Sequence, residues 1–93
     1  MKVIGLIKIL DPQAFETYRS RVGTTVERYN GKISFRGEKK LMLWNELKCE
    51  DFDAFVELEF QTEGDAYRWA NGPEYTELLA VRSKAMQLTL FSV

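Results

Sequence analysis

Four ionisable side chains in this sequence have the types and spacing for acid–base chemistry or for binding a polar group. Glu57 and Glu59 lie two residues apart in a segment that alternates apolar and polar residues. Both carboxylates therefore project from one face of a strand, with Cα atoms roughly 6.5–7 Å apart. Lys8 and Arg36 hold equivalent alternating positions in two other strand-like segments, so we expect them on the same face, flanking the carboxylates.

These four residues allow two interpretations. In the functional one, Glu59 acts as an acid or base, Arg36 orients an anionic or carbonyl group, and Lys8 and Glu57 bind the ligand, because burial beside a cation tunes the pKa of a carboxylate. In the structural one, the residues form a ladder of ion pairs that neutralises charge inside a subunit contact. Structural ion pairs are commoner than catalytic ones, so the second interpretation carries more weight.

The composition narrows the remaining chemistry. The chain has 93 residues and no histidine, which removes the usual general base and argues against zinc and His-ligated haem. We therefore expect no metal and no cofactor. The single Cys49 stands beside Glu50 and Asp51, which disfavour its thiolate, so a nucleophilic role is not expected.

Charge and hydropathy limit the classes of partner that we expect. The formal net charge is −1 with both signs interspersed, so binding to nucleic acid or to an anionic membrane surface is not expected. No segment approaches ~20 consecutive apolar residues, which argues against a membrane span. A lone cysteine excludes an intrachain disulfide, and we expect a cytoplasmic protein with one domain over 1–93.

Hydrophobic periodicity predicts the elements that must position these side chains. In chain order they are a strand at 2–10, a helix at 12–29, strands at 32–36 and 52–60, a helix from 62 to about 70, a second helix from 73, and a strand at 86–92. Asp11 and Pro12 are suited to the start of the first helix, and Gly31 to a left-handed position after its end. The segment 38–51 is ambiguous, since Leu41–Trp44 could continue a strand and the rest is a polar loop.

The order β-α-β-β-α-β predicts an α+β ferredoxin-like sandwich, an antiparallel sheet in order 4-1-3-2 with helices on one face. Alternation assigns to the helix-covered face Val3, Ile7, Ile9, Ile33, Phe35, Ala54, Val56, Leu58, Phe60, Met86, Leu88 and Leu90. The opposite face receives Ile4, Leu6, Lys8, Ser34, Arg36, Phe55, Glu57, Glu59, Gln87, Thr89 and Phe91. That mixture fits a face covered by a second copy of the chain, with a partly polar cavity between the two sheets.

An Asn-Gly-Pro trio divides the second helical region, with Trp69 before it and Glu74-Tyr75 after it. Asn71 and Gly72 end one helix and Pro73 begins the next. Trp69 and Tyr75 could form the aromatic wall of a ligand site. At helical spacing they more often pack at the edge of the sheet, and both interpretations stay open.

Motifs along nearly the whole chain resemble the bacterial domain-of-unknown-function family numbered thirteen-thirty, of the dimeric α/β-barrel superfamily. They are Asp11-Pro12 followed by Phe15 and Tyr18, Tyr29-Asn30-Gly31, Arg36-Gly37-Glu38, Glu59-Phe60, and Trp69-Ala70-Asn71-Gly72-Pro73-Glu74-Tyr75 with Arg82. Glu38, Ala70 and Gly72 depart from the usual Gly, Tyr and Ser. The segment 38–52 matches poorly and is a few residues longer than usual.

The resemblance implies a homodimer whose sheets face each other around a cavity, and it implies no established activity. The superfamily includes cofactor-free monooxygenases, polyketide cyclases, lactone isomerases and haem-binding decomposition enzymes, and fold likeness cannot choose among them. Our hypothesis is a small homodimeric protein that binds or transforms a small polar organic molecule without a cofactor, between the two sheets. The alternative is a non-catalytic homodimeric structural or interaction module, and whether the protein is an enzyme stays open.

Overall fold

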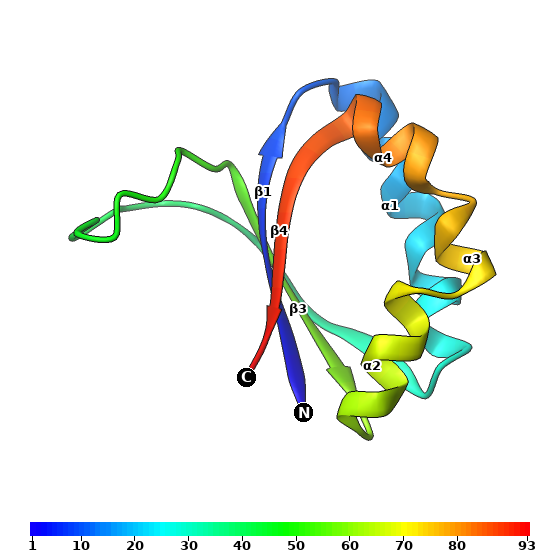
Figure 1. Ribbon diagram of the computed structural model, residues 1–93. Helices are drawn as coiled ribbons and strands as arrows, with labels where there is room; N and C mark the ends of the chain where they lie inside the picture. Colours follow the sequence, from blue (N-terminus) through cyan, green and yellow to red (C-terminus); the bar gives the residue numbers. More distant parts are fainter.

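The computed structural model describes residues 1–93 and places all of its helices on one face of a four-stranded sheet (Figure 1). The elements are β1 (Lys2–Ile9), α1 (Pro12–Glu27), β2 (Gly31–Glu38), β3 (Ala54–Phe60), α2 (Glu63–Ala70), α3 (Pro73–Thr76), α4 (Leu79–Ala85) and β4 (Met86–Ser92). The strands are antiparallel in the order β2-β3-β1-β4, which confirms the predicted ferredoxin-like α+β topology.

Helix α1 begins as its sequence predicts. The carboxylate of Asp11 accepts hydrogen bonds from the backbone N–H groups of Gln13 and Ala14, and Pro12 stands at the first helical position. Its end differs from the prediction, because Asn30 takes the left-handed conformation (φ 62°) and Gly31 does not. Gly31 is instead required by packing: a Cβ there would lie 2.6 Å from the Phe60 ring and 2.8 Å from Val26.

The second helical region consists of three short helices where we predicted two. The hydroxyl of Thr62 caps α2 by accepting the backbone N–H of Asp65. Helix α3 begins at Pro73 after Gly72, as the Asn-Gly-Pro trio indicates, and a further break at Leu78 separates α3 from α4. Helices α1 and α4 pack side by side over the sheet.

The core lies between the helices and the sheet. Its largest side chains come from all layers, and they include Tyr18, Leu58, Phe60, Trp69, Tyr75 and Leu78. Strand register places Leu58 and Val56 opposite Val3 and Gly5, so the predicted helix-covered positions of β1 and β3 are confirmed. No helix combines the length and apolar composition that a membrane span requires.

Residues 39–53, here called the arm, connect β2 to β3 without forming a helix or strand. The alternative in which Leu41–Trp44 continues a strand is therefore wrong. Figure 1 shows the arm extending away from the helices, on the side of the sheet that they leave open. Its most exposed apolar side chains are Leu41 (75% exposed), Leu43 (71%), Trp44 (79%) and Leu47 (90%).

Candidate functional site

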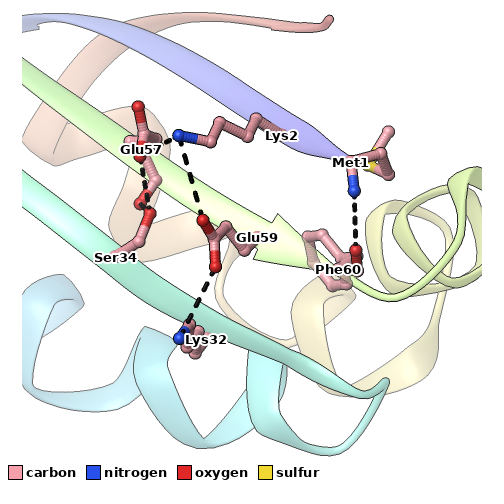
Figure 2. Close-up of polar contacts among 7 residues, drawn as sticks. All are labelled: Met1, Lys2, Lys32, Ser34, Glu57, Glu59 and Phe60. Carbon is pink, nitrogen blue, oxygen red and sulfur yellow. Dashed lines mark hydrogen bonds and ion pairs between the residues drawn. The ribbon is translucent and has the colours of Figure 1, made fainter.

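The predicted carboxylates form a charge ladder on the open face of the sheet (Figure 2). The ammonium of Lys2 lies 3.2 Å from Glu57 Oε2 and 3.9 Å from Glu59 Oε1. Lys32 Nζ lies 3.5 Å from the other oxygen of Glu59. The side chains remain partly exposed, so this geometry is that of a solvated surface network, which contributes little to stability.

The cations of this ladder are not the ones we predicted. Lys8 opposes Gln87 of β4 at the far end of β1, whereas Glu57 opposes Ile4. Arg36 lies on the other face of the sheet, so the prediction that Arg36 and Glu59 share a face is wrong. Lys2 and Lys32 take the places expected for Lys8 and Arg36 because they stand opposite Glu59 in the register.

A β-bulge at Ser34 causes the change of face. Ile33 opposes Leu58, but the next paired residue, Phe35, opposes Glu57, so Ser34 is the extra residue in β2. Because side chains alternate along a strand, one extra residue moves every later side chain to the opposite face. Phe35 therefore lies on the open face, 6.0 Å from the Phe55 ring, and Arg36 lies on the helix-covered face opposite Val56.

Ser34 also sets the ionisation of Glu57. Its hydroxyl donates a 3.0 Å hydrogen bond to Glu57 Oε2, and this bond, together with that from Lys2, holds the pKa of Glu57 below its ordinary value. A lowered folded-state pKa stabilises the fold above the unfolded pKa of about 4.3, and this contribution disappears as pH falls through the folded-state pKa.

Removing the hydroxyl of Ser34 should therefore raise the pKa of Glu57. We expect Ser34→Ala to move the pKa toward its ordinary value, whereas Ser34→Thr keeps a hydroxyl and should leave it low. An NMR titration of the side-chain carboxyl carbon measures both. Equal pKa values in the wild type and the alanine variant would mean that Lys2 alone sets the ionisation.

The main cavity of the molecule lies on the helix-covered side, between the sheet and α1, and has a volume of about 800 Å³. It is therefore not on the open face where we expected one. Apolar side chains form most of its wall, and they include Ile7, Phe15, Val22, Ile33, Val56 and Leu88. Figure 1 shows β2 and β3 curling away from the helices toward the arm. Arg36 and Glu38 near the end of β2 are exposed residues that line the cavity, and this side of the cavity is here called its mouth. The bulge favours this curl, since it bends and twists a strand.

Charged side chains at the mouth are already paired, with one exception. Arg19 lies 3.6 Å from Glu16, Lys39 pairs with Asp51, and Glu38 lies 3.7 Å from Lys40. Asp53 accepts the backbone N–H of Ile9 at 2.7 Å. Arg36 also lines the cavity but forms no ion pair and no side-chain hydrogen bond within the chain. Its guanidinium is therefore free to bind a ligand.

Trp69 and Tyr75 are buried at the centre of the core, not at the edge of the sheet. Each is 2% exposed, and their ring centroids lie 4.6 Å apart. Trp69 forms part of the cavity wall. Tyr75 does not line the cavity, but its hydroxyl is hydrogen-bonded to that of Tyr18, which does. The sequence identifies Tyr18 only as part of the motif that follows Asp11-Pro12. Its place on α1, on the helix face that carries both the cavity-lining Phe15 and the core residues, is the signal that could have found it.

Gly72 has a steric role beside this site. The hydroxyl of Tyr29 donates a 2.5 Å hydrogen bond to Glu74, and a Cβ at position 72 would lie 2.4 Å from that hydroxyl oxygen. The bond raises the pKa of Tyr29 and lowers that of Glu74. The Gly where Ser is usual thus accommodates a direct contact between the end of α1 and the start of α3.

Comparisons with known proteins agree with this architecture. The model of a domain of unknown function, DUF1330, matches residues 3–93. Among curated proteins, none matches this sequence. Three solved structures share the fold, and at these identities the likeness shows the fold alone. A protein of unknown function from Rhodopseudomonas palustris, RPA0582, is 21% identical, covers 97% of this chain and 78% of its own, and has a TM-score of 0.75.

The other two are more distant in sequence. SnoaB, a cofactor-independent oxygenase from Streptomyces nogalater, is 11% identical over 99% of this chain and 90% of its own, with a TM-score of 0.63. A dimeric protein of unknown function and ferredoxin-like fold from Bacteroides fragilis is 14% identical over 99% of this chain and 94% of its own, with a TM-score of 0.56.

Proposed function

This chain belongs to the DUF1330 family, and we propose that it binds a small, largely apolar organic molecule that carries an acidic or carbonyl group. The observation that carries this proposal is the cavity of about 800 Å³ between the sheet and α1, with the unpaired Arg36 at its mouth. Ligand sites are typically 300–1,000 Å³, mainly apolar, and contain a few polar groups that fix orientation. The proposal replaces the expected polar ligand by a mainly apolar one because apolar side chains form most of the wall.

Arg36 is the residue that we assign to the acidic or carbonyl group. A guanidinium presents several N–H donors in one plane and can bind a carboxylate through two parallel hydrogen bonds. Arg19 and Lys39 are less suited, since each already has a carboxylate partner. The predicted role of Arg36 in orienting an anionic group is thus retained at a new position.

A matched pair of charge-removing variants tests this assignment. We expect 2-naphthoic acid to bind the wild type in isothermal titration calorimetry and to raise its melting temperature. Arg36→Gln should weaken binding about 10- to 100-fold, since a hydrogen bond to a charged group contributes about 1.5–3 kcal/mol. Lys8→Gln removes the same charge from the open face and should leave the affinity unchanged.

The position of the bound molecule requires a separate control. Ala54 lies in the cavity wall and is only partly buried, so Ala54→Trp should fill the space without breaking the core. We expect this variant to fold and to lose binding. Equal binding by Ala54→Trp and the wild type would exclude the cavity as the site, and no binding by any aromatic acid or ketone would contradict the proposed function.

Conversion of the bound molecule without a cofactor is a further part of the proposal. Its support is fold analogy alone: SnoaB, a cofactor-independent oxygenase, has the same fold. The predicted acid–base role of Glu59 would then apply only to a molecule lying against the open face, because Glu59 and the cavity are on opposite sides of the sheet.

A second candidate function is that of a homodimeric interaction module, with the open face as the contact. Phe35 and Phe91 are 55% and 47% exposed on that face, beside Ile4, Leu6 and Phe55. The arm, which carries exposed apolar side chains such as Trp44 and Leu47, extends on the same side of the sheet (Figure 1). A monomeric protein rarely exposes so large an apolar area, and a relative with this fold is dimeric. The two proposals are compatible, since cavity and contact lie on different sides of the sheet.

A cytoplasmic location completes the proposal. Cys49 is exposed and unpaired at the arm, and an exposed free thiol persists most readily in a reducing compartment. The formal net charge of the chain is −1, so we propose neither a nucleic acid nor an anionic membrane as a partner.

A further inference from the structure

Two buried tyrosine hydroxyls lie in contact, one of them on Tyr18, which lines the cavity. The hydroxyl oxygens of Tyr18 on α1 and Tyr75 on α3 are 2.7 Å apart, and the two side chains meet edge to face with ring centroids 6.3 Å apart. Tyr18 is 6% exposed and Tyr75 is 2% exposed. At this depth a hydroxyl that lacks a partner is costly, so every hydrogen of the pair requires an acceptor.

The chain does not provide an acceptor for both hydroxyl hydrogens of this pair. Arg82 Nη1 donates a 3.2 Å hydrogen bond to the hydroxyl oxygen of Tyr75, and a guanidinium can only donate. The pair carries two hydroxyl hydrogens, and a single bond joins the two oxygens. Neither hydroxyl has any other hydrogen bond in the chain. One of the two hydrogens is therefore left without a protein acceptor.

The direction in which the hydrogen bonds run from Arg82 through Tyr75 to Tyr18 identifies that hydrogen. A hydroxyl that accepts from a cation becomes a stronger donor, so Tyr75, which accepts from Arg82, donates to the oxygen of Tyr18. This order leaves the hydrogen of Tyr18 without an acceptor. Tyr18 lines the cavity and Tyr75 does not, so the unused donor belongs to the residue that can meet a ligand.

We propose that the hydroxyl of Tyr18 donates its hydrogen to a carbonyl oxygen of the molecule bound in the cavity. This inference rests on the proposed binding function and adds a second polar contact for the ligand to the one assigned to Arg36. The class is a cyclic or aromatic ketone. Burial raises the pKa of Tyr18, so the donor stays protonated at neutral pH.

A fluorescent ketone tests the hydrogen bond directly. The emission of 6-propionyl-2-(dimethylamino)naphthalene moves to longer wavelength when its carbonyl accepts a hydrogen bond, so the spectrum reports the donor independently of affinity. We expect the wild type to bind this probe and Tyr18→Phe to shift the bound emission to shorter wavelength. The affinity of Tyr18→Phe should fall about 3- to 10-fold, the range expected for one neutral hydrogen bond.

Tyr75→Phe is the matched control, since it removes one hydroxyl from the same buried pair and leaves that of Tyr18. Its bound emission should remain close to that of the wild type, and melting temperatures show whether both variants fold. If emission and affinity are the same in Tyr18→Phe and the wild type, or if only Tyr75→Phe shifts the emission, the assignment to Tyr18 is overturned. A different result would contradict the proposed binding function itself. The probe would then not bind the wild type, or would bind Ala54→Trp equally well, and the role of Tyr18 would be excluded as well.

Discussion

Replacing Trp69 with alanine is expected to destabilise the protein by about 3–5 kcal/mol, a large part of the 5–15 kcal/mol typical of a domain. The indole is 2% exposed and lies between the rings of Phe60 and Tyr75, at centroid distances of 5.5 and 4.6 Å. Its N–H donates a 3.0 Å hydrogen bond to the hydroxyl of Thr25. Truncation therefore removes packing and a buried hydrogen bond together, and it opens the cavity wall. Urea unfolding followed by far-ultraviolet circular dichroism measures the loss.

The second tryptophan provides the control. Trp44 is 79% exposed in the arm, so Trp44→Ala should change the free energy of unfolding by no more than about 0.5 kcal/mol. Trp69→Phe keeps a ring but loses the indole N–H, and it should fall between the two. Similar unfolding free energies for Trp69→Ala and Trp44→Ala would contradict the central position of Trp69 in the core.

Phe91→Glu is expected to convert the proposed dimer into a monomer. Phe91 opposes Ile4 at the apolar part of the open face, and a second copy covering that face would bury the new carboxylate without a partner. Burying an unpaired charge costs several kcal/mol, so we expect the dissociation constant to rise by roughly two to three orders of magnitude. Light scattering coupled to size-exclusion chromatography, over a range of protein concentrations, measures the mass.

The same substitution on the other side of the molecule separates this effect from net charge. Tyr67 is 72% exposed on α2, so Tyr67→Glu adds an identical charge far from the proposed contact and should leave the mass unchanged. A wild-type chain that stays monomeric at several hundred micromolar would exclude the homodimer. A Phe91→Glu variant that remains dimeric would place the contact elsewhere, for which the arm is the next surface to test.

Much of the fold could be predicted from local sequence signals. Alternation and helical periodicity identified the four strands and the helical regions. The order of these elements predicted the sheet topology. The cap at Asp11 depends on residues within three positions, so it was readable in the sequence. Family membership could also be predicted, because motifs such as Asp11-Pro12 and Trp69 to Tyr75 keep their order and spacing.

The candidate site could be predicted only in part. Glu57 and Glu59 share the open face as expected, because strict alternation holds throughout β3. Alternation fails in β2, where the bulge at Ser34 inserts one residue, and no local signal in Lys32–Arg36 marks that position. The assignment of Phe35 and Arg36 to faces was therefore reversed, and with it the predicted partner of Glu59.

The sequence by itself determined the order of strands and helical regions, the start of the first helix at Asp11 and the absence of histidine chemistry, since these depend on residue types and on near neighbours along the chain. Only the tertiary structure decided which cation meets which carboxylate, on which side of the sheet the cavity lies, and that Tyr18 meets Tyr75, which in turn accepts a hydrogen bond from Arg82. These ion pairs and hydrogen bonds join residues up to 57 positions apart, as in Lys2 with Glu59 and Tyr18 with Tyr75. They depend on strand register and helix packing, and a single extra residue in one strand is enough to change them.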